Sequence, residues 1–595
     1  MPERPDAGLA HRAPSLPDGV AGAPRRRLSL PVMAHAATLI AGLAFWAWTD
    51  RKLWFFGDEW DFLASRGLFN PPNSPSGIFY PHNEHWSTLP ILLWRALFNT
   101  FHLSSYWPYL VPLLLAQALV VHLVWRAALR SGASPWLATV GAGLLAFLGA
   151  GAEDLTWAFQ IGFVGAVMFG LAAVELVERA FASHGRTGHG RSAHLGWASG
   201  CLVAGLMCST VGVAMVVAAG VLAARRLGWR RWLTLIGPPV GVYLLWFLAV
   251  GHLGLSEHSD TVDLTVLSGA PGYAWAGLSG ALGQAFDAPA LGGALLVALG
   301  VWVGANLERL WRRGPVALAL AGGALAFYLL AGVGRDATTV SPAVSRYIYI
   351  CIALLLPAVT AALSGRTRRA APTVAAAGLL FLVAVGNLGQ AQATIGARNS
   401  LVSGLKTTFF ATADWLARGA HDVSGPTAPP IPPFPNLSAG QLARFAANGW
   451  VGHVPLSAQD LSNARALLAV GTWTGSEDAL TAAPLFPDRF IYERSATSVR
   501  RTGGGCLVFA GLSTVWLKVP RSAVGASVRV AVNFEGGAIQ NISAGIVPLR
   551  GPASTQPVTL AIGGKATGYF DDNYPGSLAV LTWGGPGPLR LCGLR

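Results

Sequence analysis

Charged residues are the scarcest part of this sequence. Only 12% of its 595 residues are Asp, Glu, Lys or Arg, against about 25% in an ordinary soluble protein. Apolar residues make up 53%, and the mean hydropathy is +0.48. This composition excludes a disordered chain, and 5 cysteines in such a length exclude a disulfide-dense secreted scaffold. The sequence therefore predicts a polytopic membrane protein.

Nucleotide-binding motifs are also absent. The sequence has neither a phosphate-binding loop motif nor a Gly-x-Gly-x-x-Gly run after a predicted strand. Its net charge of +14 would suggest nucleic acid in a soluble protein, so the placement of the charges decides what they mean. Lysine is rare, and arginine carries almost all of the positive charge.

Long apolar runs predict the membrane topology. We expect eleven spans, near 31–49, 105–126, 135–151, 158–178, 194–208, 210–224, 232–251, 289–307, 315–333, 345–363 and 371–390. The alternative for 194–208 and 210–224 is one tilted helix of about 30 residues. With eleven spans all six arginine clusters between or before the spans face the cytoplasm, whereas merging that pair separates Arg179–Arg191 from Arg225–Arg231. Arginine retention therefore favours two short helices.

The chain divides into four parts. Residues 1–29 read as a disordered cytoplasmic tail before an uncleaved signal anchor, with a cleaved signal peptide as the alternative. Residues 30–390 form an all-α transmembrane domain, and 391–479 a helical and proline-rich linker region. Alternating residues between Gly and Pro turns predict an extracytoplasmic antiparallel β-sandwich over 480–595. We expect a disulfide between Cys506 and Cys592 in that domain, with two free thiols as the alternative.

The first extracytoplasmic loop, residues 50–104, carries an acidic cluster. Asp58, Glu59 and Asp61 follow directly after the first span. Carboxylates so close together repel one another and lose hydration near the membrane, which perturbs their pKa values. One of them could be a general base, and two could hold a divalent cation. The alternative is a solvated acidic patch.

A second cluster in the same loop contains His82, Glu84 and His85. A transition metal could bind here, but the spacing matches no closed zinc pattern and no third distant ligand is evident. We expect instead that Glu84 and one histidine line the same polar cavity as Asp58. Neighbouring tryptophans would offer faces for a sugar ring or anchor the loop at the membrane interface; they are Trp54, Trp60, Trp86 and Trp107.

Two later loops add candidates. Polar and aromatic residues at the mouth of the next pair of spans could join the same cavity; they are Glu153, Asp154, Trp157 and Gln160. Arg335 and Arg346, followed by Tyr347, lie outside against the arginine bias. A phosphate at the interface would compensate these two arginines, and the alternative is that they form structural ion pairs with Asp336, Glu153 or Asp154.

This order of features resembles the GT-C superfamily of polyprenyl-phosphate-sugar-dependent glycosyltransferases, close to the protein-mannosyl and aminoarabinose transferases of bacteria. The resemblance covers 30–390 and rests on the motifs 57–61, 81–86 and 345–347. It implies an inverting transfer of a sugar from a polyprenyl-phosphate donor to an envelope glycan, lipid or protein at the bacterial plasma membrane. By the same resemblance, Asp58 is the base, Asp61 or Glu59 orients it, and Arg335 and Arg346 hold the donor phosphate.

Other functions stay open on the sequence alone. A transporter or flippase would be expected to show repeated halves, and no convincing internal repeat is visible. A non-catalytic scaffold that displays a glycan-binding C-terminal domain is the other alternative. No cofactor is identified beyond a possible divalent metal, and the pattern does not choose between Asp58 and Asp61 as the base.

Overall fold

The structure is a computed structural model. It describes residues 29–595 except 68–69, 72–73, 183–187, 258–263, 335–339, 365–369, 418–430, 432–433, 435, 474–490, 495–497, 503–506, 511–512, 519–527, 535–539, 549–557, 563–566, 573–576, 584–587 and 595. The predicted tail 1–28, Arg335 and Cys506 therefore lie outside the described residues, as does the side chain of Cys592, so the disulfide stays a prediction.

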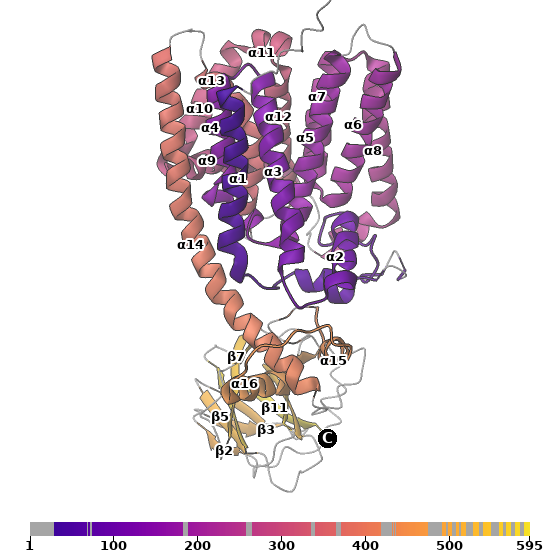
Figure 1. Cartoon of the computed structure of the whole chain (residues 1–595). Helices are drawn as coiled ribbons and strands as arrows, with labels where there is room; N and C mark the ends of the chain where they lie inside the picture. The colour runs from indigo at the N-terminus through magenta and orange to yellow at the C-terminus, as the bar shows by residue number, and fades with distance from the viewer. Residues whose placement is uncertain are drawn as a thin grey trace, which may run out of the picture.

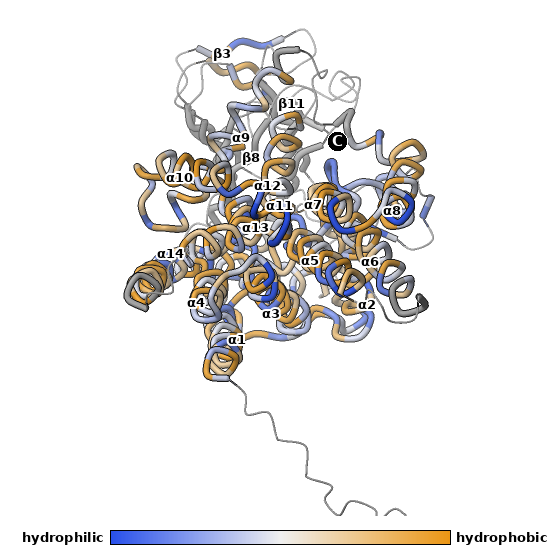
Figure 2. Tube along the Cα trace, turned by 90° about the horizontal axis from the view of Figure 1, so that it is seen from above, coloured by the Kyte–Doolittle hydropathy of each residue, from blue (hydrophilic) through white to orange (hydrophobic). Residues whose placement is uncertain are grey.

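A bundle of helices forms the larger part of the molecule (Figure 1). Its helices are α1 (Leu30–Thr49), α3 (Trp107–Arg130), α4 (Pro135–Ala146), α5 (Ile161–Ala182), α6 (Gly188–Cys208), α7 (Val211–Arg226), α8 (Trp229–Ala249), α9 (Leu264–Ala285), α10 (Gly292–Ala305), α11 (Leu307–Arg313), α12 (Pro315–Gly334), α13 (Ser345–Leu363) and α14 (Ala370–Ala417). Every predicted span falls on one of these helices. Seen from above, the bundle is largely hydrophobic, with hydrophilic stretches at α11 and α3 (Figure 2).

Length and composition support fewer spans than eleven. Among the described residues, 7 helices are long and apolar enough to cross a membrane, or up to 8 if the bent pair α10 and α11 is one span. The difference arises partly because α4 has only 12 residues, or about 18 Å of helix. Helix α7, with 16 residues, is also short. The sequence pattern did not predict α9, which is rich in glycine, alanine and serine.

The doubtful pair of spans forms two helices. α6 ends at Cys208 and α7 begins at Val211, so the single long helix is wrong. The two pack closely enough that a Cβ on Gly212 would lie 2.7 Å from the carbonyl carbon of Gly205. This close approach requires glycine.

The bundle has two chemically different ends. At one, which we call the arginine end, buried Glu175 pairs with Arg126, Arg130 and Arg179, while Glu178 pairs with Arg130 and Arg226. These ion pairs join α3, α5 and α7. The opposite end, the loop end, carries the first loop and the short helix α2 (Thr88–Phe101) (Figure 1).

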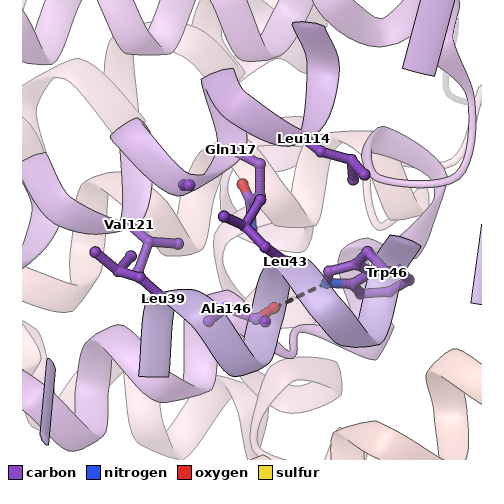
Figure 3. Close-up of a pocket in the computed structure, with 9 residues that line it drawn as sticks. Leu39, Leu43, Trp46, Leu114, Gln117, Val121 and Ala146 are labelled. Atoms are coloured by element: carbon purple, nitrogen blue, oxygen red, sulfur yellow. Dashed lines mark hydrogen bonds between the residues drawn. The ribbon is translucent and has the colours of Figure 1, made fainter. Parts of the chain in front are cut away.

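Helix α1 joins the bundle through a tight apolar seam. The indole of Trp46 donates a hydrogen bond to the Ala146 carbonyl at the end of α4, over 2.8 Å. Leu39 and Leu43 of α1 lie beside Gln117 of α3 at the same seam (Figure 3). The cavity there is about 10 Å³, too small to hold more than a water.

Helix α14 leaves the bundle as one continuous helix of 48 residues and ends beside the C-terminal part (Figure 1). The sequence divided this stretch into a span and a following helix. Beyond it, α15 (Ala439–Ala447) begins with a capping box formed by Ser438 and Gln441. The Gln441 amide also donates to the Ala64 carbonyl, and the Leu103 amide donates to the Trp450 carbonyl. This part of the predicted linker region therefore packs against the first loop.

The C-terminal part follows α16 (Ala458–Ala469) and has two antiparallel sheets. One has six strands in the order β1-β9-β6-β11-β4-β3, and the other has five in the order β2-β5-β10-β7-β8. The strands are β1 (Val470–Trp473), β2 (Ile491–Arg494), β3 (Ser498–Arg501), β4 (Leu507–Ala510), β5 (Ser513–Lys518), β6 (Val528–Phe534), β7 (Gln540–Pro548), β8 (Val558–Ile562), β9 (Thr567–Asp572), β10 (Ser577–Trp583) and β11 (Leu589–Leu594). β6, β8 and β10 coincide with the alternating segments, while packing of the two sheets as a sandwich stays a prediction.

Candidate functional site

Aromatic side chains fix the start of the first loop in the core. Phe55 packs edge-on against Tyr106 and Tyr109 at ring distances of 5.0 and 4.9 Å. Trp60 stacks on Phe409 of α14 at 5.2 Å. Trp54, Trp60 and Trp86 are all buried, so they offer no open face to a sugar, whereas Trp107 is partly exposed.

A glycine turn presents the acidic cluster. Gly57 has φ +61°, in the left-handed region that side chains rarely adopt. A Cβ at this position would lie 3.2 Å from the Trp157 ring. The chain therefore turns sharply between buried Phe55 and Asp58, directly against the second loop.

The three carboxylates then occupy different surroundings. The Asp58 side chain is 45% exposed and the Asp61 side chain 9%, while Glu59 is fully buried. A substrate hydroxyl can reach only a carboxylate that is open to solvent. Exposure thus separates Asp58 from its neighbours, which the sequence pattern did not.

Asp61 is the centre of an ion-pair cluster. It accepts hydrogen bonds from Arg66 Nε at 2.9 Å and from His82 Nδ1 at 2.8 Å. Arg66 also donates to the carbonyls of Gly77, Tyr80 and Pro81. The cluster joins the two sequence motifs 57–61 and 81–86, so the role of Asp61 is to hold the first loop in its folded shape. His82 Nε2 lies 3.7 Å from Asp58 Oδ2.

The pKa values of this cluster follow from burial and pairing. Burial alone would lower the pKa of His82, but hydrogen bonds and the charges of Asp58 and Asp61 outweigh it and raise the pKa to about 9. Burial would raise the pKa of Asp61, yet His82 and Arg66 bring it below its ordinary value. His82 is therefore a cation at neutral pH, between two carboxylates.

Glu59 points into the protein. It accepts hydrogen bonds from the Tyr106 hydroxyl at 2.5 Å and the Phe56 amide at 2.9 Å. Burial raises its pKa to about 8 although these hydrogen bonds act the other way. Tyr106 in turn accepts from the Ala158 amide at 2.9 Å, so Glu59 connects the first loop to the second.

The second histidine of the loop, His85, has polar partners of its own. Residues 82–85 form a tight turn closed by reciprocal backbone hydrogen bonds of 3.0 Å, with Asn83 at φ 53°. His85 contacts Ser209 and Thr210 at the start of α7 and lies 3.5 Å from Glu84. His82 and His85 therefore differ in their polar partners, although both line one small cavity. Among the described residues, no three His, Cys, Asp or Glu side chains gather where they could hold a metal ion.

The second loop, 149–160, does adjoin the first loop, as predicted. Phe159 packs against Phe62 at 4.7 Å and His82 at 5.2 Å, and Trp157 stacks on Phe56 at 5.1 Å. Buried Gln160 lines a small cavity with His82 and His85. Trp157 and Gln160 thus lie beside the Asp58 turn.

The late loop reaches the second loop through an ion pair. Arg346 Nη1 lies 2.8 Å from Glu153 Oε1, and Ser345 accepts from the Glu153 amide. This is the structural bridge that the sequence left as an alternative. Tyr347 is buried against Phe327 and Tyr328 in the core, so its ring does not face an open site.

Asp154 is a buried carboxyl without hydrogen bonds. It is fully buried, and neither oxygen has a partner among the described residues. Burial, together with the Glu153 charge, raises its pKa well above the ordinary value, and Arg346 acts in the opposite direction. Burial thus disfavours the charged form of Asp154.

Sequence reasoning missed one cation at the site. Arg398 of α14 lies over the rings of Phe56 and Trp157, with its guanidinium carbon 4.8 and 5.8 Å from the centroids. Its Nη1 atom is buried and has no hydrogen-bond partner among the described residues. Arg398 follows the last predicted span by only eight residues, and that position outside the membrane was the available signal.

Comparisons with known proteins include a similar solved structure. No family model and no curated protein matches the chain. The chain is similar to the crystal structure of ArnT from Cupriavidus metallidurans bound to undecaprenyl phosphate, with 14% sequence identity and a TM-score of 0.42. The match covers 73% of this chain and 92% of the other. It assigns no role to any residue here.

Proposed function

We propose that this chain is an integral-membrane glycosyltransferase that moves a sugar from a polyprenyl-phosphate donor to a hydroxyl of a cell-envelope acceptor. The observation that supports this most strongly is the difference between two carboxylates. Asp58 is open to solvent at the turn, whereas Asp61 is buried and held by Arg66 and His82. The buried cluster of Asp61, Arg66 and His82 holds the loop around Asp58 in place. A carboxylate positioned in this way can accept the proton of an acceptor hydroxyl more effectively than a carboxylate in a solvated acidic patch.

The proposed reaction inverts the sugar. Asp58 accepts the proton of the acceptor hydroxyl while that oxygen bonds to the anomeric carbon. The bond between this carbon and the phosphate oxygen breaks, and its electron pair leaves with polyprenyl phosphate. Protonated His82, at 3.7 Å, orients Asp58. No step is assigned to a metal.

We assign the donor phosphate to Arg398. Its buried Nη1 donor has no partner among the described residues, whereas Arg346 already pairs with Glu153. A buried cation gains most from an anion that hydrogen-bonds to it. We also propose that Arg335 binds the donor phosphate, as the sequence suggested. Arg346 would bind phosphate only by releasing Glu153.

The proposed placement follows from this chemistry. The loop end and the C-terminal part face the extracytoplasmic side of a bacterial plasma membrane, and the N-terminus faces the cytoplasm. The C-terminal sheets would bind envelope glycans. Donor sugar, acceptor and linkage are left open.

Binding of polyprenyl phosphate by the purified chain tests the substrate class. We expect Arg398→Ala to weaken binding at least tenfold and Arg398→Lys to weaken it less, because lysine keeps the charge but loses the fork of donors. Arg309→Ala at the arginine end is the control and should bind normally. Absence of binding by the unmodified chain would contradict the proposal, and would leave a transporter or a scaffold.

A further inference from the structure

A second polar pocket lies beside the candidate site. It is formed by the end of α1, the start of α3 and α14, and has a volume of about 90 Å³, several times the space of one water. Its polar lining comes from Asp50, Arg51, Ser104, Ser105 and Lys406, with the rings of Trp54, Tyr106 and Trp107. The buried rings of Trp54 and Tyr106 belong to the wall between this pocket and the Asp58 turn.

The pocket contains charges of both signs. The Lys406 ammonium lies 4.8 Å from the Trp54 ring centroid, and the Arg51 guanidinium lies 3.8 Å from that of Trp48. Asp50 is 2% exposed. Its Oδ1 accepts only a 3.5 Å contact from Thr49, and its Oδ2 has no hydrogen-bond partner among the described residues. A buried carboxyl with an unpaired oxygen indicates a missing donor.

The depth of the pocket points to lipid. It lies where the apolar run of α1 ends and that of α3 begins. Trp48 and Trp107, at its two sides, are 67% and 38% exposed, and exposed tryptophans at helix ends mark the headgroup level of a bilayer. A ligand at this depth of the membrane would therefore be a lipid headgroup.

The charges select the kind of headgroup. A phosphate would meet Arg51, Lys406 and the Ser105 hydroxyl, whereas the Ser104 hydroxyl already donates to the Phe101 carbonyl. An ammonium with N–H groups would supply the donor that Asp50 lacks. An anionic glycerol headgroup would leave Asp50 unpaired. A trimethylammonium group has no N–H to donate.

We propose that this pocket binds the phosphate and primary ammonium of an aminophospholipid headgroup. The proposal does not depend on the proposed transfer reaction, although the charge of Arg398 also acts on Asp50. The bound lipid would hold the end of α1 and the adjoining part of α14 at the membrane surface, where the first loop begins.

Native mass spectrometry of the full chain with added lipids tests this proposal. We expect phosphatidylethanolamine to be retained at least tenfold better than phosphatidylglycerol or phosphatidylcholine. Asp50→Asn and Lys406→Ala should each remove most of this preference, while Glu308→Gln, at an exposed carboxylate of the arginine end, should not. Equal retention of the three lipids, or a preference unchanged in both pocket variants, would overturn the proposal.

A lipid series covers the case in which Asp50→Asn does not fold. The unmodified chain is compared with phosphatidylethanolamine carrying one, two or three N-methyl groups. Retention should fall stepwise and be lost at three, because each methyl removes a donor for Asp50. Constant retention along the series would contradict the assignment of Asp50.

Discussion

At the scale of single residues, the environment divides the work among three neighbouring carboxylates. Asp58 is exposed beside a cationic histidine, Glu59 joins two loops from the inside, and Asp61 anchors Arg66. Their sequence spacing gave no means to separate these roles, because their partners come from distant positions, such as Tyr106, which is 47 residues from Glu59. Because the three carboxylates have different surroundings, substitutions of Asp58 and Asp61 should have different effects.

Asp58→Asn should lower transfer by about 10²–10⁴-fold, the usual contribution of a positioned base, with an unchanged melting temperature. Asp61→Asn should instead destabilise the fold by about 3–5 kcal/mol, because buried Arg66 loses its charge partner. Thermal unfolding and transfer assays of both variants check this. An active Asp58→Asn protein would contradict the role of Asp58 as the general base.

His82 should make stability depend on pH. Its pKa of about 9 in the folded protein lies above the ordinary 6.5. Its contribution is therefore complete below about pH 6.5 and is lost as the pH rises through 9. Each pKa unit corresponds to about 1.4 kcal/mol, so the contribution is about 3 kcal/mol.

The measurement is the difference in unfolding free energy between the unmodified chain and His82→Gln from pH 6 to 10. Taking the difference cancels Glu59, whose raised pKa of about 8 also lowers stability with rising pH. The difference should shrink toward high pH. A difference independent of pH would show that folding does not raise the pKa of His82.

At the scale of elements, the turn before Asp58 depends on Gly57. Gly57→Ala must adopt φ +61°, which costs about 1–2 kcal/mol, and its Cβ would press on the Trp157 ring at 3.2 Å. We expect reduced transfer together with a lower melting temperature. Gly196→Ala in α6, where a Cβ meets nothing within 4 Å, is the matched control and should lower neither transfer nor the melting temperature, because alanine favours a helix interior over glycine.

Sequence patterns predicted the helices better than their lengths. Uninterrupted apolar runs located α1, α3 and α12 closely. The pattern missed α9 because its glycine, alanine and serine residues lower the hydropathy while still packing against α12 and α13. It also cut α14 at residue 390, since a hydropathy signal ends at the membrane although the helix continues to Ala417.

The cation of the site could not be predicted for a related reason. Arg398 lies over Phe56 and Trp157, which are more than two hundred residues away in sequence. Only the folded position of α14 brings these groups together. Arg346, by contrast, pairs with Glu153, which the sequence offered as the alternative to a phosphate contact.

At the scale of the whole molecule, the two ends of the bundle should face opposite sides of the membrane. Asn99→Cys in α2 and Glu308→Cys in α11 place thiols on exposed residues at the loop end and the arginine end. With Cys506 and Cys592 replaced by serine, an impermeant maleimide added to intact cells should label position 99 alone. Labelling of position 308 without permeabilisation would reverse the proposed orientation.

The most direct test of the proposed function is independent of the sugar. The purified chain in lipid nanodiscs is incubated with a panel of polyprenyl-phosphate sugars and acceptor-containing envelope membranes, and free polyprenyl phosphate is measured by mass spectrometry. If the proposal is right, the unmodified chain releases polyprenyl phosphate and Asp58→Asn releases at least a hundredfold less. Equal release by the two proteins, or none with any donor, would contradict it.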